Sequence, residues 1–113
     1  MTTTMRVPVH TDDRGALLAV ELDQAPFPVR RVFVVTSVPA EVTRGGHGAP
    51  CRELLVLVWG RACVVRNDVS LALDQPGEAV LVERDDDVTY RFLDEHGVLL
   101  VLAEEPWQPR DDA

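Results

Sequence analysis

The chain contains no lysine, and all eleven of its basic residues are arginine. Chemistry that requires a lysine Schiff base is therefore excluded. No apolar run approaches the roughly 18 to 20 residues that cross a bilayer, and the start of the chain lacks the continuous apolar stretch of a secretory signal. We expect a cytoplasmic protein with no membrane partner. Its 113 residues fit one domain over residues 1–113, with a core over about residues 8–107 and disordered first four and last four residues.

Positive charge and cysteine are also scarce. Nineteen acidic residues against eleven basic residues give a formal net charge of −8, which repels a phosphate backbone, so nucleic acid is not an expected partner. The only cysteines are Cys51 and Cys63, and thiols stay reduced in a chain that is not exported. If residues 60–61 form a hairpin turn, these cysteines lie far out of register, and we expect no disulfide.

No segment has the apolar periodicity of a helix, and no internal repeat is present. Short segments rich in Val and Leu recur instead between turn residues, which is typical of a β-sandwich or β-barrel. The fold class is therefore predicted to be all-β. The eight predicted strands are Ala16–Leu22, Val29–Thr36, Glu53–Trp59, Ala62–Arg66, Val69–Leu73, Ala79–Glu83, Val88–Phe92 and Val98–Ala103.

The strand patterns also predict which faces are buried. Segments 54–59 and 98–102 are continuously apolar, which is typical of central strands that are covered on both faces. The segment 88–92 alternates instead, so that Tyr90 falls on its apolar face and Arg91 on the opposite face.

A histidine-containing motif precedes the apolar segment 54–59. Residues 44–53 read Arg-Gly-Gly-His-Gly-Ala-Pro-Cys-Arg-Glu, and a glycine follows after six further residues. This segment resembles the first cupin motif, in which two histidines separated by one residue are followed by a glutamate, six residues and a glycine. His47, Glu53 and Gly60 stand at matching positions, and Ala49 replaces the second histidine.

Among the cupins, the chain most resembles the WxcM-like nucleotide-sugar 3,4-ketoisomerases, which act on dTDP-4-keto-6-deoxyglucose. The matching segments are 13–17, 31–33, 44–47 and 53–60, and the similarity covers about residues 8–107. The resemblance implies a small RmlC-like jelly-roll β-barrel with no metal and no other cofactor. It also implies a small-molecule substrate, for which a dTDP-sugar is the candidate, and a homodimer that exchanges an N-terminal strand.

The resemblance further implies proton-transfer chemistry at the motif. Moving a carbonyl to the neighbouring sugar carbon requires removing a proton next to the ketone, forming an enediol and returning a proton at the adjacent position. His47 would carry the proton, because imidazole titrates near neutral pH, and Arg44 would stabilise the enolate. Glu53 or Tyr90 would substitute for the absent histidine. The predicted catalytic residues are His47, Arg44 and Tyr90, and the predicted substrate-binding residues are Arg14, Phe33, Glu53 and Arg91.

The same residues have other interpretations. His47 follows two glycines, as a surface loop histidine would, and the pattern around Tyr90 also suits a core residue. Arg44 could pair with Glu41 or Glu53 instead of a ligand. A weak metal site of His47, Glu53 and Asp87 is a further alternative, although the acidic run 83–87 favours a solvated turn.

Two other functions are also open. Family members commonly carry tyrosine where this chain has Phe33, and Phe33, Val34 and Ala49 reduce the polarity of the predicted pocket. This composition suits a cupin recruited as an isomerase or cyclase of a non-sugar secondary metabolite. The other alternative is a non-catalytic small-molecule-binding module.

Overall fold

The computed structural model describes residues 4–107, in which β-strands make up nearly all of the regular structure. The all-β prediction is confirmed. No helix in this part of the chain is long and apolar enough to cross a membrane. The predicted disorder of the ends falls on residues outside the described range, except that Thr4 belongs to the first strand. The elements are β1 (Thr4–Arg6), β2 (Val9–Asp12), β3 (Gly15–Leu18), η1 (the 3-10 helix Leu22–Gln24), β4 (Arg31–Thr36), β5 (Arg44–Gly46), β6 (Glu53–Trp59), β7 (Ala62–Arg66), β8 (Val69–Leu73), β9 (Glu78–Val82), β10 (Val88–Phe92) and β11 (Val98–Ala103).

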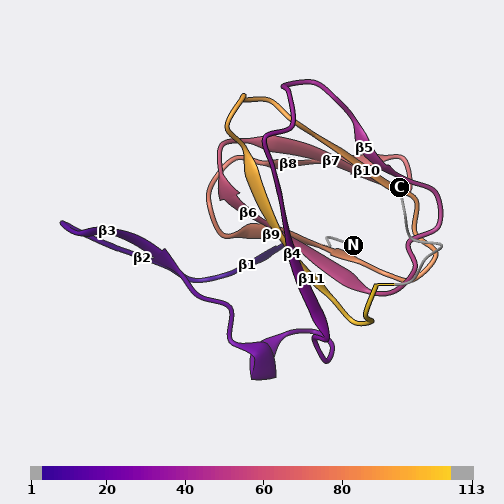
Figure 1. Cartoon of the computed structure of the whole chain (residues 1–113), viewed down its shortest axis with the longest axis horizontal. Helices are drawn as coiled ribbons and strands as arrows, with labels where there is room; N and C mark the ends of the chain where they lie inside the picture. Colours follow the sequence, from indigo (N-terminus) through magenta and orange to yellow (C-terminus); the bar gives the residue numbers. More distant parts are fainter. Residues whose placement is uncertain (1–3, 108–113) are drawn as a thin grey trace.

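These strands form two larger sheets and one hairpin. One sheet has the order β1-β9-β6-β11-β4, and the other has the order β5-β10-β7-β8. The two larger sheets face one another, and the β2–β3 hairpin projects away from them (Figure 1). Within residues 4–107 no strand pairing joins the two larger sheets. The predicted barrel is therefore present as two facing sheets and not as one closed ladder.

The main core lies between the two larger sheets. Alternate side chains of each strand point into it, and Leu55 of β6 and Phe92 of β10 are almost completely buried there. Burying each such side chain stabilises the fold by roughly 1.5–3 kcal/mol. The face prediction for residues 88–92 is confirmed, because Tyr90 packs against this core while Arg91 lies on the opposite face of its strand.

A second apolar cluster covers the outer face of the five-stranded sheet. Leu54 and Val56 of β6 and Leu102 of β11 are buried there against Val7 and Phe27 from the N-terminal part of the chain. Both strands are therefore covered on both faces, as their continuous apolar sequences predict.

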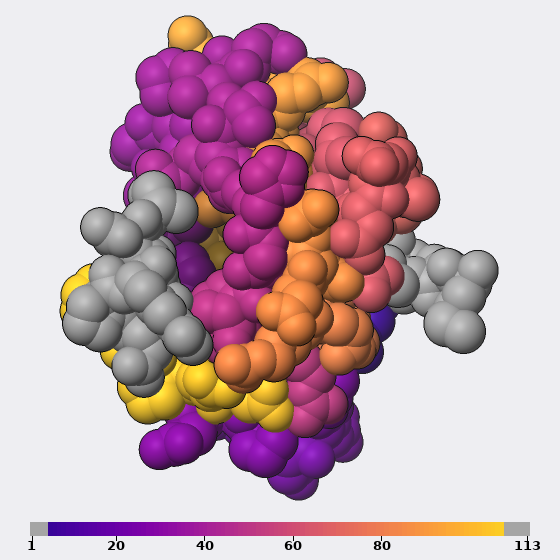
Figure 2. Space-filling model, turned by 90° about the vertical axis from the view of Figure 1, so that its right-hand side faces the viewer, coloured from indigo at the N-terminus to yellow at the C-terminus, as the bar shows by residue number. Residues whose placement is uncertain are grey.

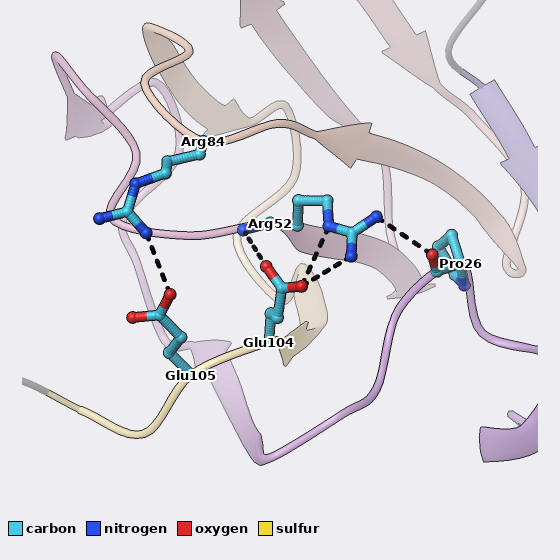
Figure 3. A network of polar contacts seen from close by, with 5 residues as sticks. All are labelled: Pro26, Arg52, Arg84, Glu104 and Glu105. Atoms are coloured by element: carbon cyan, nitrogen blue, oxygen red, sulfur yellow. Dashed lines mark hydrogen bonds and ion pairs between the residues drawn. The ribbon is translucent and has the colours of Figure 1, made fainter.

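Polar contacts fasten this covering segment to the sheet (Figure 3). Arg52, just before β6, donates to the Glu104 carboxylate through Nη2 at 2.6 Å and through Nε at 3.2 Å. Its Nη1 donates to the Pro26 carbonyl at 3.4 Å, and its guanidinium carbon lies 5.5 Å from the centre of the Phe27 ring. The hydrogen bond from Arg52 lowers the pKa of the Glu104 carboxyl below its ordinary value. These contacts hold the covering segment at the ends of β6 and β11.

The strands β6, β7, β8, β10 and β11 have the predicted bounds. The predicted strand 16–22 is shorter than expected, because β3 ends at Leu18 and η1 begins at Leu22. Three strands were not predicted: β1, β2 and β5. Of these, β5 contains two glycines, which are more typical of turns than of strands. Gly45 is opposite Thr89 of β10 with φ of +95°, and a Cβ there would lie 2.3 Å from the carbonyl oxygen of Val88. Glycine therefore permits this strand pairing instead of breaking it.

The predicted hairpin at residues 60–61 is wrong. β6 pairs with β9 and β11, whereas β7 pairs with β8 and β10. At Gly60, with φ of +81°, the chain passes from one sheet to the other. The prediction of no disulfide is confirmed, because Cys51 and Cys63 are both free thiols.

Candidate active site

The histidine motif lies at one edge of the four-stranded sheet. β5 is the edge strand and pairs with β10, which places Arg44 opposite Tyr90, and His47 follows β5 directly. β4 is an edge strand of the facing sheet, and residues 37–43 connect β4 to β5. Figure 2 shows this side of the molecule, where a hollow lies beside the magenta segment that contains β5. The predicted site therefore borders an opening between the two sheets.

Backbone hydrogen bonds hold the end of the motif against the loop 83–87. The Ala49 N–H donates to the Asp86 carbonyl at 2.8 Å, and the Asp85 N–H donates to the Ala49 carbonyl at 2.9 Å. Ala49, which stands where the motif has its second histidine, is half-buried and packs against the main core. The inner wall is therefore apolar at this position.

His47 lies at the surface with a carboxylate partner. Its side chain is 95% exposed, and its Nδ1 lies 3.3 Å from Oδ1 of Asp87. The same oxygen accepts a hydrogen bond from the Gly48 N–H at 3.0 Å. The Asp87 carboxylate therefore lies beside Nδ1 of His47, and Nε2 is the ring nitrogen farther from it. The sequence prediction considered Asp87 only as a metal ligand.

The neighbouring Asp86 is the centre of a hydrogen-bond network. Its carboxylate accepts from Arg66 Nε at 2.6 Å, from Asn67 Nδ2 at 2.9 Å and from the Glu83 N–H at 2.7 Å. Burial raises the pKa of the Asp86 carboxyl, but these hydrogen bonds outweigh burial and hold it below its ordinary value. The side chain is only 12% exposed. The prediction that the run 83–87 is merely a solvated turn is therefore wrong for this residue.

Arg44 and Tyr90 are brought together by the strand register. Tyr90 is half-buried against the main core, and Arg44 is exposed beside it. Among residues 4–107 Arg44 forms no ion pair, because Glu41 accepts instead from Arg91 Nη1 at 2.6 Å. Arg91 lies on the outer face of β10, so the structure does not bring this predicted binding residue to the opening.

Phe33 of β4 and Glu53 of β6 belong to the inner face of the five-stranded sheet. Phe33 is half-buried against the main core, and the guanidinium carbon of Arg31 lies 4.5 Å from its ring centre, a cation–π distance. Arg31 is opposite Ala103, which is opposite Glu53 on its other side. Arg31 was not among the predicted site residues. The sequence signal for Arg31 is its position two residues before Phe33, which places both side chains on the same face of a strand.

Arg14 lies apart from these residues. It occupies the turn of the β2–β3 hairpin, where its Nη2 donates to Oδ2 of Asp12 at 2.7 Å. This hydrogen bond lowers the pKa of the Asp12 carboxyl. The hairpin projects from the two larger sheets (Figure 1), so within one chain Arg14 is not brought together with His47.

The metal-site alternative is not assembled in the described part of the chain. No group of three His, Cys, Asp or Glu side chains there is arranged to hold a metal ion. His47 and Asp87 come together, but Glu53 does not join them.

Comparison with known proteins identifies the family. The family model described as WxcM-like, C-terminal matches residues 1–112. The chain belongs to this family. No curated protein sequence matches it.

Solved structures show what fold this WxcM-like chain shares. A 3,4-ketoisomerase from Helicobacter canadensis has a TM-score of 0.83 and 24% identity, covering 96% of this chain and 86% of that chain. QdtA, a sugar 3,4-ketoisomerase from Thermoanaerobacterium thermosaccharolyticum in complex with TDP, has the same TM-score and identity over 96% and 83%. The rmlC epimerase of Mycobacterium tuberculosis has a TM-score of 0.77 and 20% identity over 95% and 64%. The WxcM-like chain therefore has an RmlC-like fold.

Proposed function

We propose that this WxcM-like protein is a divergent cupin-type isomerase that transfers protons next to a ketone, resembling the dTDP-4-keto-6-deoxyhexose 3,4-ketoisomerases. The observation that carries the proposal is His47, which lies 3.3 Å from Asp87 beside the edge where Arg44 is opposite Tyr90. Family membership over residues 1–112 supports it. So do two relatives of the same fold described as 3,4-ketoisomerases, one of them in complex with TDP.

In this reaction His47 removes the proton from the carbon next to the ketone. The electron pair moves to the carbonyl oxygen, where the Arg44 guanidinium stabilises the negative charge. The proton of the neighbouring hydroxyl moves to the former carbonyl oxygen, so that the negative charge passes to the oxygen of the new ketone. The former carbonyl carbon is protonated by the Tyr90 hydroxyl in place of the missing histidine, and Tyr90 recovers its proton through solvent from the His47 imidazolium. Phe33 and Glu53 contact the substrate. The sequence of steps is redox-neutral and requires no cofactor.

The functional form in this proposal is a cytoplasmic homodimer of one jelly-roll domain over residues 1–113. A two-stranded hairpin is marginally stable alone, yet β2 and β3 pair only with each other among the described strands, and Leu17 on this hairpin is 59% exposed. A second copy would cover the hairpin and bring Arg14 to the partner's opening.

A second candidate is a non-catalytic module that binds the same class of ligand. The observation in its favour is Ala49, which packs against the core and leaves the inner wall without the motif's second histidine. Such a protein would bind a nucleotide sugar and release it unchanged.

The test incubates the protein with dTDP-4-keto-6-deoxyglucose in D₂O and follows deuterium incorporation and product by NMR. His47→Ala is expected to lower the rate about 100-fold or more, the range of a lost general base. His96→Ala is the matched control, since His96 is an exposed histidine in the turn between β10 and β11, and it should keep the wild-type rate. Equal rates for His47→Ala and wild type would refute the role of His47. Binding of dTDP without deuterium incorporation would favour the binding module.

A further inference from the structure

Three arginines have no carboxylate partner in the described part of this acidic chain. The formal net charge is −8, and most arginines here are neutralised locally. Those in ion pairs are Arg6, Arg14, Arg52, Arg61, Arg66, Arg84 and Arg91. Arg30, Arg31 and Arg44 are the remaining arginines of residues 4–107.

Arg31 faces the space between the sheets. It lies on the same face of β4 as Phe33 and Val35, which both pack in the main core. Its guanidinium lies over the Phe33 ring. The side chain is half-buried. Glu53 lies in the same cross-strand row beyond Ala103, but no ion pair joins Arg31 to a carboxylate of residues 4–107.

Arg44 approaches the same opening from the other sheet. Residues opposite each other in an antiparallel pair share a face, so Arg44 lies on the face of Tyr90, which packs against the core. The two arginines therefore stand on edge strands of the two facing sheets, β4 and β5. Both arginines without a carboxylate partner on these edge strands therefore lie on the faces that look into the space between the sheets.

We infer that Arg31 binds the diphosphate of the ligand, which leaves Arg44 for the reacting sugar. The identity of the ligand rests on the proposed function. A guanidinium offers paired N–H donors that match phosphate oxygens, and stacking on Phe33 fixes its plane before the ligand arrives. Partial burial also weakens screening by salt. Phe33 thus has a role that requires no hydroxyl group: it supports the diphosphate-binding side chain.

The test measures binding of dTDP, inorganic pyrophosphate and thymidine to the full chain by calorimetry. Arg31→Gln should raise the Kd for dTDP and pyrophosphate about 10- to 100-fold, the range for losing a charged hydrogen bond, and leave thymidine unchanged. Arg30→Gln removes the same charge one residue earlier, outside β4, and should change the Kd less than about threefold because exposed charges are screened. Arg31→Lys, which keeps the charge but not the paired donors, should lie between the two, and it tests the inference if Arg31→Gln is unstable.

Each outcome separates this inference from the proposed reaction. Equal effects of Arg31→Gln and Arg30→Gln overturn the inference, even if wild type turns over the keto-sugar. Failure of wild type to bind either dTDP or pyrophosphate overturns it as well. Binding that depends on Arg31 in a protein with no turnover upholds the inference and refutes the isomerase.

Discussion

The two ends of the pair of larger sheets are built differently. Where β6 passes into β7, glycine backbone packs tightly against its neighbours: a Cβ at Gly97 would lie 2.1 Å from Cδ1 of the Phe92 ring, and one at Gly60 would lie 3.0 Å from Cα of Gly97. Where β9 passes into β10, the loop is held instead by hydrogen bonds from Arg66 and Asn67 to Asp86. Backbone contact leaves no room for a side chain, whereas a hydrogen-bonded loop can present exposed groups such as His47. Tight packing and chemistry are therefore concentrated at opposite ends.

The largest expected effect is at the end where β6 passes into β7. Gly97→Ala should lower the free energy of unfolding by about 3 kcal/mol, since the new methyl group overlaps the buried Phe92 ring. Gly46→Ala in β5 is the control, because a Cβ there meets nothing within 4 Å, and it should change stability by less than about 0.5 kcal/mol. Urea unfolding measures both. Similar midpoints for the two variants would show that the ends do not differ in tightness.

The next largest effect on stability is at the opposite end, where β9 passes into β10, and it depends on pH. Asp86→Ala should cost about 2 kcal/mol at neutral pH, because it leaves the half-buried Arg66 without its carboxylate. The pKa of Asp86 is lowered in the folded state. Its stabilisation is therefore complete above the unfolded-state pKa of about 4 and is lost as the pH falls through the lower folded value. The stability difference between the variant and wild type should stay constant from about pH 7 to about pH 4, and their unfolding curves should converge only as the pH falls below about 4. A difference that does not shrink at low pH would contradict the charge assignment. Asp85→Asn, which removes a neighbouring exposed carboxylate, should show no such convergence.

A smaller effect is expected one step further along the network. Asn67 donates to Asp86 and accepts from the Asp87 N–H, and its φ is +48°. Asn67→Gly removes both side-chain hydrogen bonds while permitting that φ, and should cost about 1 kcal/mol. Asp68→Gly is matched, because Asp68 occupies the same turn with φ of +70°. It should cost less than about 0.5 kcal/mol, and an equal loss in both would mean that the turn backbone, and not the network, is responsible.

The smallest stability effect should accompany a change in chemistry. Asp87→Ala removes an exposed contact and should alter the free energy of unfolding by less than about 0.5 kcal/mol. The neutral His47 ring should, however, lose its preference for carrying the proton on Nδ1. Nitrogen NMR of the imidazole reports the tautomer directly. An unchanged tautomer in Asp87→Ala would show that the 3.3 Å contact does not orient His47.

The strands that could be predicted are those whose burial is visible in their own sequence. The continuous apolar run of β6 and the alternation of β10 sufficed for both bounds and faces. β5 could not be predicted in this way, because its glycines resemble a turn and its pairing depends on Thr89, far along the chain. The crossing of the chain from one sheet to the other at Gly60 could not be predicted for a related reason. A glycine in a turn does not show whether the next strand joins the same sheet.

The candidate site was predictable in part. The motif spacing singled out His47 and Arg44, and the register then places Tyr90 beside Arg44. The burial of Asp86 could not be inferred, because it depends on donors from a different hairpin, and an acidic run alone indicates only solvation. The position of Arg14 on a projecting hairpin depends likewise on tertiary structure.

The five-stranded sheet carries its last strand in its middle. β11 is hydrogen-bonded to β6 on one side and to β4 on the other, and β1 is paired with β9. Pairing of such distant segments is slow, because long loops must close before the contacts form. During synthesis β6 can pair with β9, but its other edge stays unpaired until β11 has been made. An unpaired apolar edge promotes aggregation, so the order of synthesis leaves the centre of this sheet exposed for longest.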